Sequence, residues 1–200
     1  MGIDRHRWAM APMGAILLAI VSGWGVARAV PDAGGPAQPA GAQGDGQRDF
    51  DFEFGAWKAH VRRLVKPLTG SNTWVELDGT SVVRKLWDGE GNVGELDISG
   101  PSGRIQGVTV RLYNPRARQW SVSFSSRAAG TQGQPLYGRF QGGRGEFFDQ
   151  ETLDERAITV RFVFSDITPD TFRFEQAFSE DGGKSWEVNW IATFQRTPGR

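Results

Sequence analysis

Carboxyl groups are the first candidates for chemistry in this sequence, because a pair of them can catalyse hydrolysis by general acid–base action. Such a pair needs one carboxyl group in an apolar setting that raises its pKa. The candidates lie in two polar stretches of the chain: Asp49, Asp51 and Glu53 in the first, and Asp149, Glu151, Asp154 and Glu155 in the second. Because of these polar surroundings we expect all seven side chains to be solvated, and we predict no catalytic pair.

Ligands for a metal or haem are scarce. The chain has no cysteine, its three methionines lie within the first 13 residues, and His60 is the only histidine after residue 29. In an extended strand His60 shares a face with Lys58 and Arg62 and lies opposite Trp57, so it should point outward, where it is a poor ligand. We therefore expect no cofactor and no metal; haem, or a serine nucleophile with a histidine base, would have only His60 to use.

Two glycine motifs suggest nucleotide binding but lack the flanking elements that such sites need. Residues 89–94, GEGNVG, match G-x-G-x-x-G, yet a strand pattern follows where the dinucleotide-binding helix should begin. Residues 179–186, SEDGGKSW, contain the GKS of a P-loop, but Phe178 stands where its first glycine should be. Neither motif is interpreted as a phosphate site.

The stretch SEDGGKSW also resembles, as S-x-D-x-G-x-x-W, the Asp-box hairpin of sialidase propeller blades. A propeller needs several such boxes at blade spacing and a much longer chain. We interpret the single box as a structural hairpin between two strands.

The first 29 residues have the pattern of a secretory signal peptide. A basic start, Arg5-His6-Arg7, precedes an apolar run, and Ala27-Arg28-Ala29 supplies the small residues of a signal peptidase site. We expect cleavage after Ala29 and a secreted or periplasmic protein without a stable membrane span; an uncleaved anchor is the alternative. Residues 30–48 are rich in Pro, Gly, Ala and Gln and are predicted to be a disordered linker, which leaves residues 49–200 as one domain.

Charge excludes one class of partner. From residue 30 onward the chain has 20 Lys and Arg against 22 Asp and Glu. Nucleic-acid binding requires a basic excess, so we expect no nucleic-acid partner.

Alternation of apolar and polar residues with a period of two predicts β-strands through the rest of the chain. It is strongest over residues 104–113, 119–125, 157–165, 171–178 and 186–196. Weaker strands fit 74–78, 81–87, 93–98, 136–141 and 146–148, with turns at Asp78-Gly79 and Asp88-Gly89 among others, and 59–68 fits a helix or a first strand. Without helices to cover a sheet, the apolar faces must cover one another. We predict an all-β fold, a single antiparallel up-and-down β-barrel of about ten strands, with a two-sheet sandwich as the alternative.

The inward-facing side chains would make a very aromatic lumen: Trp120, Val122, Phe124, Phe162, Phe164, Phe172, Phe174, Phe178, Val188 and Trp190. Two polar residues, Arg84 and Gln176, fall on the same side of the alternation and would also point inward. A buried guanidinium needs a partner such as an internal carboxylate or the polar head of a ligand. The predicted ligand site is therefore Arg84, Trp120, Phe124, Phe162, Phe174, Gln176 and Trp190. The alternative is a lumen that these side chains simply fill.

The stretch FEFGAW, residues 52–57, contains a G-x-W that resembles the opening signature of calycin-type barrels, which are the lipocalins, the fatty-acid-binding proteins and the nitrobindin-like group. In those families the Trp closes one end of the barrel and a late Arg packs over it, which implies these roles for Trp57 and Arg196. The ordered set FDFEFGAW, DGTSVVRKLWDG, VTVRLYNPRARQWS and RFVFSDITPDTFRFEQAFSEDGGKSWEVNW is similar to an uncharacterised, largely bacterial domain family near those barrels. Nitrobindin-type relatives hold haem through a late histidine, and this chain has none after His60.

Three functional hypotheses follow. The first is a secreted or periplasmic barrel that binds a small hydrophobic or amphipathic ligand. The second is a metal-free barrel enzyme, such as an isomerase, cyclase or hydrolase, which would need an inward carboxyl group or His60 with a perturbed pKa. The third is a non-catalytic envelope module, which would need Trp74 and Trp87 to form one exposed patch.

Overall fold

In a computed structural model of the chain, which describes residues 45–198, ten antiparallel strands form one closed barrel. This confirms the predicted fold class. The strands are β1 (Gly55–Leu64), β2 (Trp74–Leu86), β3 (Gly91–Gly100), β4 (Gly103–Asn114), β5 (Gln119–Ser126), β6 (Pro135–Gln141), β7 (Arg144–Leu153), β8 (Arg156–Ser165), β9 (Thr171–Ser179) and β10 (Glu187–Arg196). Two short 3-10 helices, η1 (Asp51–Glu53) and η2 (Trp87–Gly89), precede β1 and β3.

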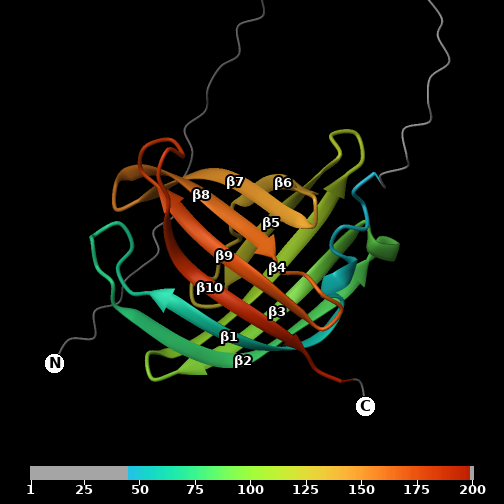
Figure 1. The fold of residues 1–200 in the computed structure, drawn as a ribbon, viewed down its shortest axis with the longest axis horizontal. Coiled ribbons are helices and arrows are strands. Elements are labelled where there is room, and N and C mark those ends of the chain that lie inside the picture. The colour runs from blue at the N-terminus through green and yellow to red at the C-terminus, as the bar shows by residue number, and fades with distance from the viewer. Residues whose placement is uncertain (1–44, 199–200) are drawn as a thin grey trace, which may run out of the picture.

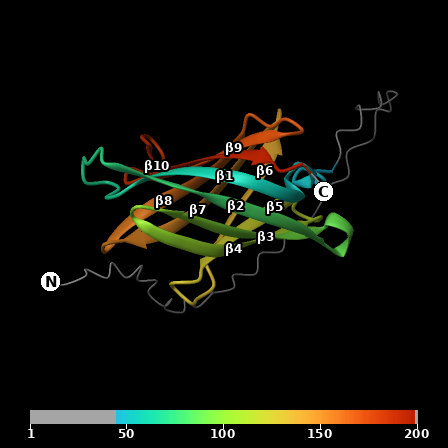
Figure 2. The same ribbon diagram turned by 90° about the horizontal axis from the view of Figure 1, so that it is seen from below.

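Each strand pairs with the next along the chain, and β1 pairs with β10 to close the sheet (Figure 1). Closure leaves no strand edge unpaired, which an open sheet of this size would have to protect by other means. Figure 2 shows that the barrel is flattened, broader than it is deep.

Strand β2 runs without interruption through Asp78 and Gly79, where the sequence predicted a turn. The glycine serves another purpose, because a Cβ at position 79 would lie 2.0 Å from the carbonyl oxygen of Asp97 on β3. The predicted turn is therefore wrong, and the two predicted strands, 74–78 and 81–87, are one strand that ends at Leu86.

The predicted signal peptide, residues 1–29, and the predicted linker up to residue 44 lie outside the described residues. The last four linker residues are described, and they contact the barrel: the indole Nε1 of Trp120 donates a hydrogen bond of 2.8 Å to the Gly46 carbonyl, and the Tyr113 hydroxyl donates one to the Asp45 carbonyl. Residues 45–48 therefore belong with the folded domain rather than with a disordered linker.

The segment before β1 fills one end of the barrel, which we call the closed end (Figure 1, blue). Phe50 is fully buried there, and its ring packs against four other aromatic rings of the lumen with centroid distances of 4.9 to 5.6 Å: Trp120, Phe140, Phe147 and Phe164. Edge-to-face contacts of this kind favour a fixed ring position. The closed end is thus plugged by side chains of the chain itself.

Trp57 and Arg196 lie together at this end. The Arg196 guanidinium carbon lies 4.1 Å from the centroid of the Trp57 ring, and the two Nη atoms donate hydrogen bonds of 2.8 Å to the carbonyls of Phe54 and Phe52. The Trp57 indole in turn donates a 2.7 Å hydrogen bond to the Glu53 carbonyl. These bonds tie the plug segment to the first and last strands.

Glu53 and Arg111 form an ion pair inside the closed end. Nη2 of Arg111 lies 2.9 Å from Oε2 of Glu53, and its Nη1 donates a 2.9 Å hydrogen bond to Asn92 Oδ1. All three residues are buried. Burial raises the pKa of Glu53 to about 7, and the positive charge of Arg111 opposes that rise. The prediction of a solvated Glu53 is therefore wrong, because η1 carries this side chain into the barrel.

We expect the replacement Glu53→Leu to lower the free energy of unfolding by about 3 to 5 kcal/mol, because it leaves the Arg111 charge buried without a counter-ion. The double variant Glu53→Leu/Arg111→Met should recover most of this loss. Urea unfolding measures both, and Glu95→Leu is the control, because Glu95 pairs with Arg84 on the exposed surface. That control should change stability by less than about 1 kcal/mol. Equal losses of stability in Glu53→Leu and Glu95→Leu would contradict a buried pair.

Candidate functional site

The inner face of the barrel follows from burial along β1. Trp57, Ala59 and Val61 are buried, whereas Lys58 between them is exposed. Residues that lie opposite one another on neighbouring strands share a face of the sheet. The register therefore assigns the inner face on every strand, starting from the pairs Trp57–Ser81 and Val61–Ala192.

Half of the lumen keeps contact with solvent. Several inner-face side chains away from the plug are only partly buried, and we call this group the open half of the lumen: Leu96, Thr109, Phe124, Phe174, Gln176 and Trp190. A side chain that points into a barrel can meet solvent only through an opening into the lumen. The barrel is thus filled by the plug at the closed end and only partly filled around these side chains, which lie beside a second buried cluster of Ala59, Val61, Leu77, Ile98 and Ala192.

Six of the seven predicted ligand-site residues lie on the inner face. Phe124, Phe174, Gln176 and Trp190 belong to the open half of the lumen, and Trp120 and Phe162 are buried. The ring of Phe162 packs edge-to-face on Phe174 at 5.1 Å. The aromatic residues that the alternation assigned to the interior therefore do converge in one lumen.

Arg84 does not point into the barrel, so the predicted orientation is wrong. Its side chain is 60% exposed and its Nη1 lies 2.5 Å from Glu95 Oε1 on the outer face. The inner-face residue is the neighbouring Val83, which is buried and pairs with Gly94. Because Val82 and Val83 are both apolar, the alternation fits either register in this strand, and the pairing with β1 and β3 decides between them.

A β-bulge between Val188 and Trp190 corrects the predicted inner face of the last strand. The extra residue, Asn189, reverses the parity, so that Val188 lies opposite Ala177 on the outer face while Trp190 lies opposite Gln176 on the inner face. Trp186 also lies outside, where its ring meets the Arg161 guanidinium at 4.3 Å.

Two carboxyl groups of β7 face the lumen, which the sequence reading missed. Asp149 lies opposite Val160 and Glu151 opposite Ile158, both of which are buried inner-face residues of β8. Burial raises the pKa of Glu151, and the negative charge of Asp149 raises it further. The polar neighbours that suggested solvation, such as Gln150, lie on the other face of the same strand. Every second residue of a strand lies on the same face, so the inward-facing Phe147 already implies that Asp149 and Glu151 face inward.

Polar groups also lie on the opposite part of the open half, where β1, β10 and β9 run side by side. Arg63 lies opposite Trp190, and Trp190 opposite Gln176. Gln176 Nε2 donates a 2.7 Å hydrogen bond to Oδ1 of the bulge residue Asn189. The lumen therefore has apolar rings between a donor-rich wall and an acidic wall.

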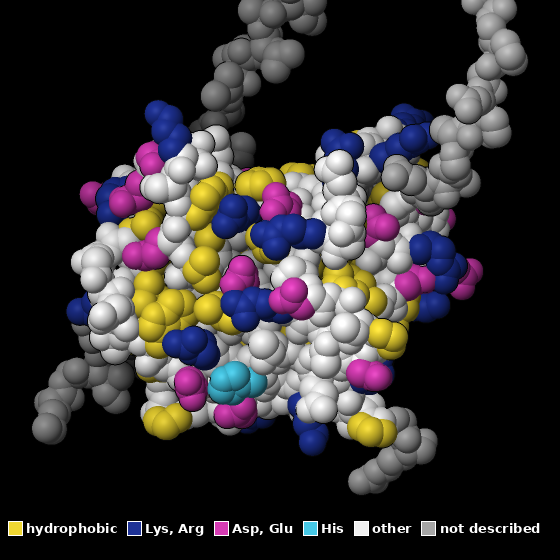
Figure 3. Space-filling model, viewed as in Figure 1, with side chains coloured by type: hydrophobic (Ala, Val, Ile, Leu, Met, Phe, Trp, Pro, Cys, Tyr) yellow, Lys and Arg dark blue, Asp and Glu magenta, His cyan; other side chains and the backbone are white. Residues whose placement is uncertain are grey.

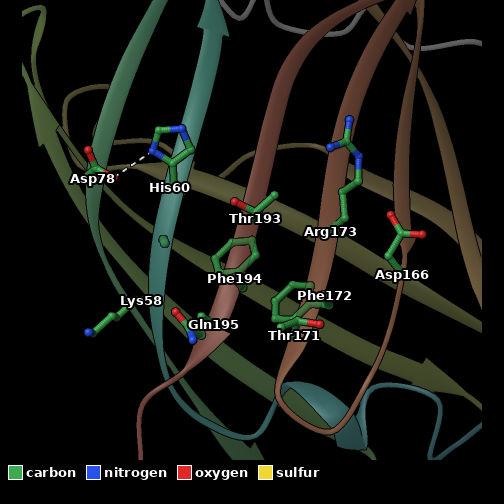
Figure 4. A pocket seen from close by; sticks show the side chains of 11 residues that line it. Lys58, His60, Asp78, Asp166, Thr171, Phe172, Arg173, Thr193, Phe194 and Gln195 are labelled. Carbon is green, nitrogen blue, oxygen red and sulfur yellow. Dashed lines mark hydrogen bonds and ion pairs between the residues drawn. The ribbon is translucent and has the colours of Figure 1, made fainter.

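His60 lies on the outer face, in a depression of about 480 Å³ over β1, β10 and β9 (Figure 4). Its Nδ1 lies 2.8 Å from Asp78 Oδ1. Thr193 on β10 lies opposite His60, and Arg173 on β9 lies opposite Thr193. Figure 3 shows positive and negative side chains interspersed over this face. An exposed histidine in such surroundings is well placed for a surface ion pair.

The SEDGGKSW stretch forms a compact hairpin between β9 and β10. Asp181 Oδ1 accepts hydrogen bonds of 2.9 Å from the backbone N–H groups of Lys184 and Ser185, and Oδ2 accepts one of 2.7 Å from the Ser185 hydroxyl. These bonds, first of all that from the Ser185 hydroxyl, hold the pKa of Asp181 below its ordinary value. The interactions of the Asp181 carboxylate are thus internal to the turn.

The two tryptophans of the third hypothesis lie at opposite ends of β2. Trp74 is its first residue, partly buried and 5.2 Å from the Arg62 guanidinium, whereas Trp87 follows its last residue and is 68% exposed. Thirteen residues of extended strand separate them by roughly 40 Å. They do not form one patch, which leaves the envelope-module hypothesis without the feature it needs.

Within residues 45–198 no group of three or more His, Cys, Asp and Glu side chains is arranged to hold a metal ion. The same residues contain no helix that is long and apolar enough to cross a membrane.

No protein-family model and no curated protein matches the chain. Among solved structures, the S-type phycobiliprotein lyase CPES from Guillardia theta is similar with a TM-score of 0.51 and 16% identity, over 77% of this chain and 93% of that chain. EF1p2_mFAP2b bound to DFHBI has a TM-score of 0.43 and 10% identity, over 76% of this chain and 99% of that chain. The ywiB protein from Bacillus subtilis has a TM-score of 0.35 and 11% identity, over 72% of this chain and 93% of that chain. At 16% identity the likeness to the lyase shows the fold alone, a calycin-like barrel.

We expect Glu151→Gln to raise the free energy of unfolding at pH 7 and to have less effect at pH 4. The folded pKa of Glu151 lies above its ordinary value of 4.5, so its contribution to stability is present below that value and is lost as the pH rises through the folded pKa. Urea unfolding at the two pH values measures the difference. Glu155→Gln in the exposed β7–β8 turn is the control, and a loss of stability on Glu151→Gln at pH 7 would contradict the luminal environment.

Proposed function

We propose that the protein is a secreted or periplasmic β-barrel that binds a small hydrophobic or amphipathic ligand in the open half of its lumen. The observation that carries this proposal is the partial exposure of Phe124, Phe174 and Trp190, which point inward above a plugged end. Apolar surface in a concave, one-ended site is what small-molecule pockets present, with a few polar groups to orient the ligand.

Two glycines on the inner face leave room for aromatic rings that a side chain there would displace. A Cβ at Gly107 would lie 2.3 Å from Cζ of Phe124, and a Cβ at Gly145 would lie 2.6 Å from Cζ of Phe140. Gly107 thus lets Phe124 of the open half approach β4 closely, whereas Phe140 packs on Phe50 in the plug.

The proposed compartment follows from the leader, and the family from the resemblance of the ordered motifs. A basic start, an apolar run and Ala27-Arg28-Ala29 direct export, with Val30 as the first residue of the mature protein. Membership in the largely bacterial family near the calycins is part of the same proposal.

Asp149 and Glu151 favour a second candidate function, a metal-free barrel enzyme. Two neighbouring carboxyl groups in a partly apolar lumen, one with a raised pKa, are the features that general acid–base catalysis uses. In that case Glu151, whose pKa is raised by burial and by the negative charge of Asp149, would act as the general acid.

The neutral fluorescent probe N-phenyl-1-naphthylamine tests ligand binding without regard to head-group charge. Thr109 lies on the inner face opposite Phe124, so Thr109→Trp should fill the open half and weaken probe binding by about tenfold or more, which is about 1.4 kcal/mol. Val108→Trp is the matched control, because Val108 is exposed on the outer face of the same strand. Absence of probe binding to the unaltered protein, or equal weakening by both variants, would overturn the luminal site.

Export is tested by expressing the full chain in a bacterium and measuring the intact mass of the exported protein. The mass should correspond to a chain that begins at Val30, and Ala29→Leu should block this cleavage because the site requires a small residue. A chain that stays in the cytoplasm at full length would contradict the proposed compartment.

A further inference from the structure

Arg63 is a luminal cation without a hydrogen-bond or ion-pair partner among residues 45–198. It lies on the inner face of β1, opposite Trp190 on β10 and Val75 on β2. Its Nε is buried and makes no hydrogen bond, and its guanidinium forms no ion pair with any residue in the described part of the chain. Burial alone lowers the pKa of Arg63, and no carboxylate is near enough to offset it.

Asn189 adds a second unpaired donor to the same wall. The residue is 2% exposed, and the hydrogen bond that its Oδ1 accepts from Gln176 draws its amide toward the inner face. Its Nδ2 is buried and has no hydrogen-bond partner among the described residues. The bulge places Asn189 next to Trp190, which lies directly between Arg63 and Gln176 in the register.

A buried donor without an acceptor is unfavourable, and more so when its group is charged. An oxygen acceptor bound at this wall would remove that cost, and a planar carboxylate fits the fork of a guanidinium best. From these contacts we propose that Arg63 and Asn189 bind the carboxylate head of an amphipathic ligand, with its apolar chain running along Phe174 and Phe124. This inference rests on the proposed function and assigns the chemical class of its ligand.

The other charges of the lumen support this position for the head group. Glu187 faces inward on β10, opposite Phe178, and its Oε1 accepts a 2.6 Å hydrogen bond from the Leu68 N–H. Asp149 and Glu151 lie on β7, two strands away from β9, and would repel an anion on their own wall. A carboxylate is therefore directed to the wall that β1, β10 and β9 form.

Two probes with the same C12 chain and opposite head groups test the proposal: dodecanoate and dodecyltrimethylammonium, titrated by calorimetry into the purified protein. Dodecanoate should bind at least about tenfold more tightly. Arg63→Met should weaken dodecanoate binding by about tenfold or more and leave the ammonium probe unaffected. Because Arg63 has no hydrogen-bond or ion-pair partner among the described residues, this variant should not lower the free energy of unfolding, whereas a structural role would.

Two further variants keep the test decisive. Arg62→Met is the matched control, because Arg62 is the next residue on β1 but faces outward near Glu76; it should leave both affinities unchanged. Asn189→Asp keeps an acceptor for Gln176 and removes the unpaired donor, so it should also weaken dodecanoate binding. Equal binding of the two probes, or equal losses in Arg62→Met and Arg63→Met, would overturn the carboxylate site while the luminal function stands. Absence of binding by both probes would overturn both the carboxylate site and the proposed luminal function.

Discussion

The ion pair between Glu53 and Arg111 is the constraint on which the shape of the lumen depends. Both side chains are buried, so each charge needs the other, and together they require the segment before β1 to enter the barrel. Phe50 enters with it and lies 5.1 Å from the Arg111 guanidinium. Arg196 holds the carbonyls of the same segment from the last strand. The plug is therefore fixed by polar contacts as well as by aromatic packing, and it decides which end of the barrel is closed.

A lumen closed at one end has unequal halves. Near the plug the rings of Phe50, Phe147 and Phe164 pack against one another and exclude solvent. Farther along, Thr109, Phe174 and Trp190 point inward and still meet solvent. Apart from the Glu53, Arg111 and Asn92 cluster at the plug, the charged and amide groups described above lie in this second half, on two separate walls. A ligand with an apolar body and one polar end would match that distribution, since its body would lie on the rings and its head would meet the donors.

The fold and most of the inner face could be predicted from the sequence, because alternation is strong wherever aromatic and polar residues exchange regularly. Trp120, Phe124, Phe162 and Phe174 follow that rule and face inward. The rule failed where two apolar residues adjoin, as at Val82 and Val83, and where the Asn189 bulge reverses parity within a strand. It could not find the Glu53–Arg111 pair, because no local pattern shows that a 3-10 helix carries a carboxylate into the barrel. Asp149 and Glu151 were misjudged for another reason: polar neighbours in sequence lie on the opposite face of a strand and say nothing about burial.

The most direct test of a half-open lumen is an NMR spectrum of the isotopically labelled protein with a doxyl-labelled fatty acid, whose unpaired electron broadens nearby resonances. We predict the strongest broadening at inner-face residues of the open half, such as Leu96, Thr109 and Phe174, and weaker broadening at Phe50 and Phe147 in the plug. Broadening confined to the outer depression around His60, or none at any residue, would contradict a half-open lumen.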